Sequence, residues 1–410
     1  MKKLLLVLLI LSLFINHLNA NEKDLQIIQK DKKEYRLLEK ESIQTRQQSQ
    51  KYDWISPIDL SGNIGRNHSF SDENSRNLNN KNTKSASIGF TQSIFESGGI
   101  GFKMDYADNR FKYEMLSWEN QNSQLIYTIY NTLLDIKKLK LEINQNDYRI
   151  VNKDIELIIK KIQYEAGKTD IIELNNAIMS KNLIQKEEIA LKNSLKEKEQ
   201  ELAKYTDLKY DEIEILDFQE TNKEIFLDKN YSILEADAKV EMLNSEYKIK
   251  KSQYLPKLSL SAKASYSSQD EKFNSMISDT NKDDATSSGS LILSMPLYDY
   301  TKSSKIQESK IEVLKQKALV NDLKNETAFE YEQIFTKIDT YLKQNETINK
   351  NIKLYEELIG ANKISSEAGM TSKYDLEILE NTKTINEFDI LINKINILQQ
   401  YAKLYFKIKN

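Results

Sequence analysis

The chain has 410 residues, of which 30% are charged and 39% are hydrophobic, and its formal net charge is −3. This near-neutral balance argues against a nucleic-acid partner, because binding to phosphates needs a concentrated basic face. The chain has no cysteine, which excludes disulfides and thiol chemistry. Its two histidines, His17 and His68, are too few for a zinc site or a histidine-dependent catalytic triad. We therefore expect no enzyme activity, no catalytic residue, no cofactor and no metal site.

The first 20 residues have the features of a secretory signal peptide. Lys2 and Lys3 precede an apolar run over residues 4–15, and the segment ends at the small residue Ala20. The apolar run is too short to cross a bilayer, although a retained membrane anchor is the alternative interpretation. We expect residues 1–20 to direct export and then to be removed.

Long helices are predicted where glycine and proline are missing. Neither residue occurs in residues 102–166, 168–255 or 297–359, which are rich in lysine, glutamate, leucine and isoleucine. Apolar residues such as Leu125, Ile129 and Leu133 recur at helical spacing, in more than one row, so each helix is expected to pack against several neighbours. A run of about 65 helical residues gives a rod of roughly 100 Å. A filamentous coiled coil would explain these tracts equally well if they stood alone.

Four segments instead alternate apolar and polar residues, as β-strands do. They lie near residues 58–65, 86–91, 258–266 and 290–297, and polar loops at residues 69–84 and 269–286 separate the members of each pair. Each strand is about ten residues long, the length of a tilted transmembrane strand. We therefore predict β-hairpins at about 57–97 and 256–299, with Pro57, Pro256 and Pro296 at the junctions between helix and strand. Aromatic residues cluster near these junctions, as in an interfacial girdle or in packing between helices and strands: Trp54, Phe95, Tyr254, Tyr298 and Tyr300.

The two halves of the chain carry the same pattern. Pro57 and Pro256 are 199 residues apart, and Gly167 and Gly369 are 202 residues apart. We expect a first repeat at residues 21–204, a partly irregular equatorial connector at 205–230, and a second repeat at 231–410. Each repeat has a helix, a β-hairpin, a long helix, a turn at Gly167 or Gly369, and a return helix.

Four strands cannot close a transmembrane barrel, because the smallest common barrels use about eight. An open edge in hydrocarbon would leave backbone groups unpaired, at several kcal/mol each. If these strands lie in a membrane, several chains must share one barrel, with eight strands in a dimer or twelve in a cyclic trimer. The alternative is a soluble four-stranded sheet beside a helical bundle.

Short motifs, repeated in order, add a family resemblance. They are Tyr-Leu-Pro-Lys-Leu-Ser-Leu at residues 254–260, Pro-Leu-Tyr-Asp at 296–299, and the turns Tyr-Glu-Ala-Gly at 164–167 and Ser-Glu-Ala-Gly at 366–369. Together with the duplicated layout, they resemble the TolC-like outer-membrane factor family of outer-membrane efflux proteins. The resemblance covers nearly all of the mature chain, from about residue 30.

The resemblance implies a mainly α-helical homotrimer that combines a twelve-stranded β-barrel in outer-membrane lipid with a helical tunnel in the periplasm. Such proteins are passive exit ducts of tripartite efflux pumps or type I secretion systems. They receive substrate from an inner-membrane transporter of the RND, ABC or MFS type through a periplasmic adaptor protein. The architecture serves drugs, metal ions, peptides and secreted proteins alike.

The resemblance also implies two adaptor-docking turns at the closed tip of the tunnel, formed by Gly167, Lys168, Thr169 and Asp170 and by Gly369, Met370, Thr371 and Ser372. Six residues after each glycine, Glu173 and Asp375 are candidates for acidic rings that face the pore. The simpler interpretation is that the glycines are helix C-caps and the carboxylates are favoured by the helix dipole. The chain departs from the family where gate bonds are usual, because Ser366 and Thr371 replace an aromatic residue and an arginine.

A different class of protein also fits much of the pattern. An exported coiled-coil interaction protein with a small soluble β-head and no pore would have the same helices. It would not need strands of transmembrane length with one apolar face.

Overall fold

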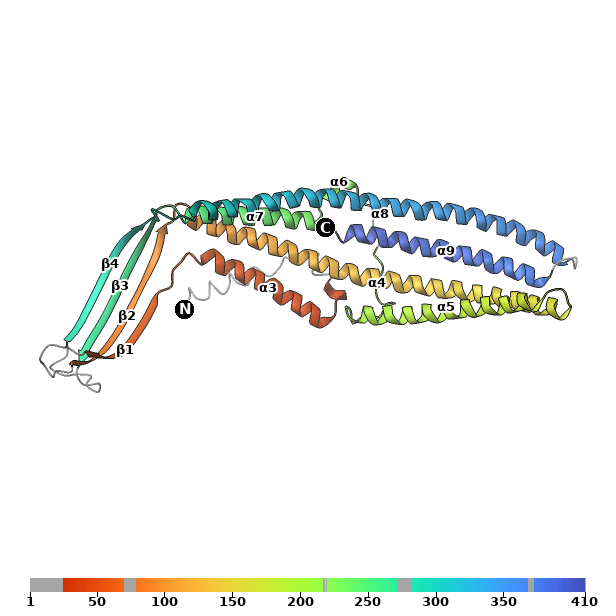
Figure 1. Ribbon diagram of the computed structural model, residues 1–410, viewed down its shortest axis with the longest axis horizontal. Coiled ribbons are helices and arrows are strands. Elements are labelled where there is room, and N and C mark those ends of the chain that lie inside the picture. The colour runs from red at the N-terminus through yellow and green to blue at the C-terminus, as the bar shows by residue number, and fades with distance from the viewer. Residues whose placement is uncertain are drawn as a thin grey trace, which may run out of the picture. The chain divides into compact units, whose positions relative to one another are not determined.

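The computed structural model describes residues 25–69, 79–216, 218, 220–270, 282–367 and 372–409. These residues form long helices and four strands, in the order shown in Figure 1. The chain divides into two compact units. The helical unit comprises the described parts of Met1–Lys40, Leu116–Leu234 and Asn321–Asn410, and the sheet unit comprises those of Glu41–Met115 and Glu235–Val320.

The helices of the two halves match in length and in order. The helices that precede the hairpins are α3 (Lys30–Tyr52, 23 residues) and α7 (Tyr231–Ser252, 22 residues). The long helices are α4 (Gly99–Glu165, 67 residues) and α8 (Lys302–Glu367, 66 residues). The return helices α5 (Ile171–Ala203) and α9 (Lys373–Tyr405) have 33 residues each. None of the described helices has an apolar stretch long enough to cross a membrane.

The four strands form one antiparallel sheet whose spatial order, β1-β2-β3-β4, is also the order in the chain. They are β1 (Asp59–Ser69), β2 (Asn79–Phe95), β3 (Lys257–Asp270) and β4 (Lys282–Ser294). The central pair, β2 and β3, joins the two halves of the sequence, with Gly89 opposite Lys263. The strands have 11 to 17 residues and so are longer than the ten predicted.

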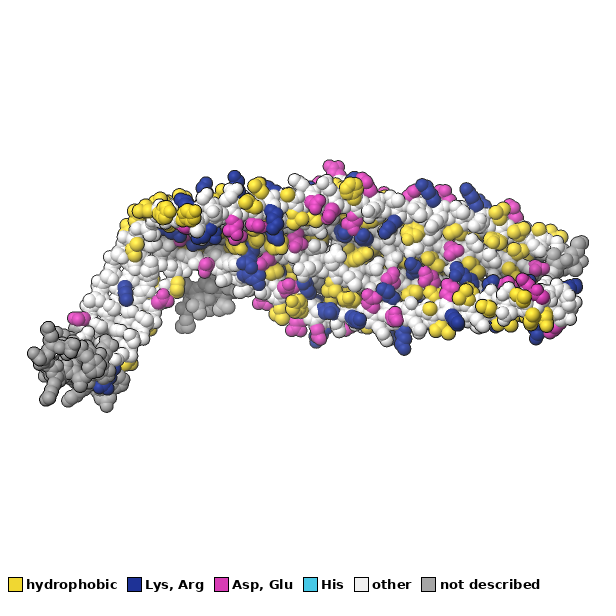
Figure 2. Space-filling view, in the orientation of Figure 1, with side chains coloured by type: hydrophobic (Ala, Val, Ile, Leu, Met, Phe, Trp, Pro, Cys, Tyr) yellow, Lys and Arg dark blue, Asp and Glu magenta, His cyan; other side chains and the backbone are white. Residues whose placement is uncertain are grey.

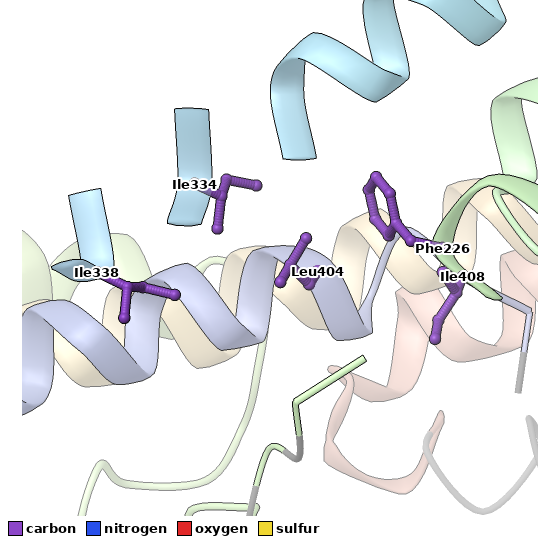
Figure 3. Packing of buried hydrophobic residues seen from close by; sticks show 5 residues of the cluster. All are labelled: Phe226, Ile334, Ile338, Leu404 and Ile408. Carbon is purple, nitrogen blue, oxygen red and sulfur yellow. The ribbon is translucent and has the colours of Figure 1, made fainter. Parts of the chain in front are cut away.

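A small helix and the end of the chain hold the middle of the helical unit together. The short helix α6 (Lys223–Asp228) inserts Phe226, which is fully buried, beside residues of α8 and the C-terminal segment. Figure 3 shows this cluster, which comprises Phe226, Ile334, Ile338, Leu404 and Ile408. Backbone bonds add to it, because Tyr231 N–H donates to Lys407 O over 2.9 Å and Lys409 N–H donates to Lys229 O over 2.8 Å.

Some boundaries differ from those predicted. The first helix, expected from residue 21, begins at Lys30 in α3 after a single 3-10 turn, η2 (Leu25–Ile27). The connector at 205–230 contains the short helix α6. Asn222 caps the start of this helix, because its side chain accepts a hydrogen bond from Ile225 N–H over 2.8 Å. The signal segment at 1–20 lies outside the described residues.

Candidate functional site

The sheet has one apolar face. Side chains alternate across a strand, so the strand register fixes which residues share a face. Leu60 pairs with Ile88 and Leu260 pairs with Leu291, and all four lie on this face. Leu60 is 79% exposed and Leu293, also on this face, is 72% exposed, so these apolar side chains lack cover within the chain. A face of this kind is suited to contact with hydrocarbon.

The opposite face is covered by serine and threonine hydroxyls, and we call it the hydroxyl face. Pairs of hydroxyls bridge adjacent strands, at 2.8 Å between Ser61 and Ser87 and at 2.8 Å between Ser265 and Thr286. Thr91 and Ser261 are linked in the same way over 3.0 Å. In Figure 2 the visible face of the strands is mostly white, the colour of uncharged polar side chains and backbone. The two faces therefore differ in the way that the lipid and water faces of a membrane barrel differ.

Both edges of the sheet are open. The outer edges of β1 and β4 pair with no other strand among the described residues. Unpaired strand edges are costly in a membrane and are a template for pairing with another chain. The sheet therefore has the form of a segment that further copies could complete.

At the end of α4, the chain turns on Gly167, whose φ of +71° lies in the left-handed region. Gly167 N–H donates to Tyr164 O over 2.9 Å, and Lys168 N–H donates to Gln163 O over 2.8 Å. These two bonds form a Schellman motif, which satisfies the last carbonyl groups of the helix. No atom lies within 4 Å of a Cβ added at Gly167, so the surface outside this turn is open.

The start of α5 follows directly. Asp170 is its N-cap, and its carboxylate accepts a hydrogen bond from Glu173 N–H over 2.9 Å. The Glu173 carboxylate pairs with Lys160 of α4 over 3.0 Å. Thr169 lies between Lys168 and Asp170 in the turn. The turn thus brings together all the residues of the first predicted docking site, while one candidate pore carboxylate is already paired within the chain.

The second predicted turn is described only in part. Gly369, Met370 and Thr371 lie outside the described residues. Ser372 is the N-cap of α9, and its hydroxyl accepts a hydrogen bond from Tyr374 N–H over 3.1 Å. Asp375 lies in the first turn of α9, where the helix dipole favours a carboxylate, and its side chain is exposed.

The prolines lie beside the strands. Pro57 stands between α3 and β1, and Pro256 stands between α7 and β3, where its carbonyl accepts a hydrogen bond from Ser97 Oγ over 2.7 Å. Pro296 lies at the other end of its strand, between β4 and α8. The aromatic residues divide into two groups, because Tyr298 and Tyr300 are exposed whereas Tyr254 is 7% exposed and packs within the sheet unit.

Polar bonds join α4 to α9 within the helical unit, and we call them the polar rungs. Gln399 donates to Asp135 over 2.7 Å, and Gln145 donates to Asp389 over 2.7 Å. Nearer the turn, Asn152 donates to the hydroxyl of Thr382 over 3.3 Å. From one bond to the next, the bonded residues advance along α4 by the same number of positions as they go back along α9. The three bonds therefore share one antiparallel register.

Neither the pairing of the hydroxyl face nor the polar rungs was predicted from the sequence. The serine-rich alternation is visible in the sequence. The hydroxyl pair between Thr91 and Ser261, however, depends on the pairing of β2 with β3 across the two repeats. The rungs between α4 and α9 likewise join residues more than 200 positions apart. Among the described residues, no group of three or more His, Cys, Asp or Glu side chains could hold a metal ion.

Comparison with known proteins agrees with this arrangement. Residues 224–403 match the family model described as outer membrane efflux protein. None of the curated proteins compared matches the sequence.

Solved structures share the fold at low sequence identity. The outer membrane protein VceC of Vibrio cholerae is 12% identical, with a TM-score of 0.71 over 93% of this chain and 94% of that chain. The outer membrane channel CmeC of Campylobacter jejuni is 12% identical, with a TM-score of 0.70 over 93% of this chain and 86% of that one. The open state of the outer membrane channel MtrE of Neisseria gonorrhoeae is 12% identical, with a TM-score of 0.67 over 91% and 85%. The fold class predicted from the sequence is thereby confirmed, and the match of residues 224–403 agrees with the family resemblance.

Proposed function

Because residues 224–403 match the outer membrane efflux protein family, we propose that this chain is the exit duct of a tripartite efflux pump or a type I secretion system. The duct is passive and catalyses no reaction. A transporter in the inner membrane supplies the energy, and a periplasmic adaptor protein links that transporter to the duct. The proposed assembly is a homotrimer with a twelve-stranded barrel.

The observation that carries this proposal is the sheet, which combines one apolar face, one hydroxyl face and two open edges. An apolar outer face and a polar inner face are what a water-filled barrel in lipid needs. Closing such a barrel removes both edges, and a single chain supplies four strands. The soluble β-head of a coiled-coil protein would leave the apolar face in water.

The proposed contact with the adaptor lies at the α4–α5 turn and at its counterpart before α9. The Schellman motif holds the backbone of the first turn rigid, and the exposed side chain of Lys168 stands at its outer surface. Of the two candidate acidic rings, Asp375 forms no ion pair among the described residues, whereas Glu173 pairs with Lys160. Exposed ion pairs are weak, at about 0–1 kcal/mol, so Glu173 stays a candidate beside Asp375.

The oligomeric state tests the duct. We expect the mature protein to be recovered from isolated outer membranes only with detergent, and to have the native mass of three chains. Recovery from the soluble periplasmic fraction at any mass would contradict the duct and favour the coiled-coil protein.

The docking turn is tested with Lys168→Trp, which enlarges the outer surface of the turn and keeps Gly167. We expect trimers to form normally and the cells to become as susceptible to toxic compounds as a strain that lacks the protein. The matched control is Lys196→Trp, an exposed lysine of α5 away from the turn. Unchanged susceptibility with Lys168→Trp would argue against docking at this turn.

A further inference from the structure

One charged row of the hydroxyl face lies between two rows of neutral hydroxyls. The strand register places Asp59 opposite Gly89, Gly89 opposite Lys263, and Lys263 opposite Ser288, so these four residues form one row across the sheet. The rows on either side contain hydroxyls: Ser61, Ser87, Ser265 and Thr286 on one side, and Thr91, Ser261 and Ser290 on the other. We propose that Lys263 sets the ionic preference of the barrel lumen and is a transient binding site for anionic groups of exported solutes. This inference rests on the proposed duct.

Lys263 is available for such a role. Its side chain is exposed, and the structure gives its ammonium group no hydrogen bond or ion pair among the described residues. Asp59, on the same face, is two strands away, and adjacent strands are about 4.8 Å apart, so the two side chains leave from points roughly 10 Å apart. An ammonium group without a close carboxylate attracts carboxylate, phosphate or sulfonate groups in the water around it.

Gly89 has no side chain, so the surface beside Lys263 is not covered at this position. A Cβ at Gly89 would lie 3.0 Å from Ala262 O and 3.3 Å from the Cα of Lys263, so no side chain fits there without a shift of the backbone. Asp59, Gly89 and Lys263 line one shallow groove on the hydroxyl face, together with Thr91 and Ser261. The groove thus gives a passing solute direct access to the Lys263 side chain.

A second lysine of this face, Lys257, is placed differently. Lys257 lies in the first position of β3, at the junction with the helices. There, burial raises the pKa of the Glu96 carboxyl, but Lys103 and Ser93, with a smaller contribution from Lys257, bring that pKa below its ordinary value. Lys263 lies six residues further along the strand, between two rows of neutral hydroxyls; Asp59 shares its row, and Asp284 lies on the same face opposite Ser267. Because the side chains in the two adjacent rows are neutral, the charge of Lys263 acts strongly on nearby ions, and in a trimer three copies would act together.

The test uses one introduced cysteine. Because the natural chain has no cysteine, that thiol is the only one in the protein that can react. The reporter is Ser288→Cys, whose Cβ lies about 5 Å from that of Lys263 as its cross-strand neighbour. In whole cells, the rates of its modification by an anionic and by a cationic methanethiosulfonate reagent are compared. The reagents enter the barrel from outside, so the state of the periplasmic tip does not matter.

We expect Lys263→Gln to lower the ratio of the anionic to the cationic rate about three- to tenfold, as Coulomb's law predicts for one charge at this distance in water. Lys84→Gln is the matched control, because it removes the same charge from the apolar face of the same sheet and should leave the ratio unchanged. If the thiol reacts but the ratio does not depend on Lys263, the inference is wrong and the duct stands. If neither reagent reaches Ser288→Cys, the hydroxyl face does not line an aqueous lumen, and the proposed duct fails as well.

Discussion

Single residues decide the conformation of the α4–α5 turn. Gly167 adopts a φ of +71°, which costs a residue with a Cβ about 1–2 kcal/mol. The cost is conformational rather than steric, because the space around Gly167 is open. The turn thus depends on glycine for its backbone alone.

We therefore predict that Gly167→Ala loosens the turn. Loss of about 1 kcal/mol should speed amide hydrogen exchange of Gly167 and Lys168 about fivefold, because their N–H groups make the two bonds of the motif. The control is Gly101→Ala, a helical position that is equally open but has an ordinary φ. It should leave this exchange unchanged and stabilise α4 by about 0.5–1 kcal/mol. Equal exchange in both variants would show that the φ of Gly167 is not the constraint.

Single-residue features could be predicted from the sequence where they depend only on neighbouring residues in the chain. Gly167 and the N-cap Asp170 could be identified from a glycine that ends one helical tract and an acid that begins the next. Lys263 could not, because an alternating strand shows that a residue shares a face with its neighbours but not which side chains flank it. That depends on the register of β2 and β4 against β3.

Pairs of helices are fixed by polar contacts as well as by apolar packing. The polar rungs hold α4 against α9, and Glu330 of α8 holds the end of α9 through Lys403 at 2.8 Å and Lys407 at 2.5 Å. Burial raises the pKa of the Glu330 carboxyl, but the hydrogen bonds from the two lysines outweigh this effect and leave the pKa below its ordinary value. Groups of this kind specify one register among several that apolar stripes alone would allow.

The contribution of Glu330 should depend on pH. Its folded pKa lies below the ordinary value of 4.5, so its contribution is complete above about pH 4.5 and is lost as the pH falls through the folded pKa. We expect Glu330→Gln to lower the free energy of unfolding by about 1–3 kcal/mol at pH 7, and by much less near pH 3. Denaturant unfolding of the purified protein at the two pH values measures this.

Glu332 is the matched control for this experiment. It lies two residues away on the same helix and pairs with Lys223 over 2.7 Å, but its side chain is 60% exposed. Glu332→Gln should therefore change the stability by less than about 1 kcal/mol at pH 7. If the two variants behave alike, the contacts of Glu330 with Lys403 and Lys407 are not what holds the end of α9.

For the molecule as a whole, the sheet matters most. Its two faces differ in chemistry, and the difference runs through every strand. Neighbouring residues on one strand therefore have opposite environments, as Ser87 and Ile88 of β2 do.

This pair supplies a direct test of which face meets lipid. Ile88→Lys should lower the amount of trimer in the outer membrane sharply, because a lysine on the lipid side costs about 2–4 kcal/mol per copy near the bilayer centre. Ser87→Lys, which places the same charge on the hydroxyl face, should assemble at nearly the normal level. Quantifying trimers in outer-membrane fractions compares the two, and a greater loss with Ser87→Lys would reverse the assignment of the faces.

The architecture could be predicted from the sequence because the chain contains an internal repeat. The two prolines before the hairpins, the glycine-free tracts and the return helices recur about 200 residues apart, and each copy supported the interpretation of the other. Contacts between the copies could not be predicted in this way. The pairing of β2 with β3 and the polar rungs join distant segments, and their geometry follows from packing rather than from local preference.

The open edges of β1 and β4 also have a consequence for gene dosage. If a ring closes only when three copies join, one defective copy is enough to spoil it. A cell that makes normal and defective chains in equal amounts would then assemble only about one ring in eight from normal chains alone. A faulty version of this protein that still joins the ring would therefore be dominant over the normal one.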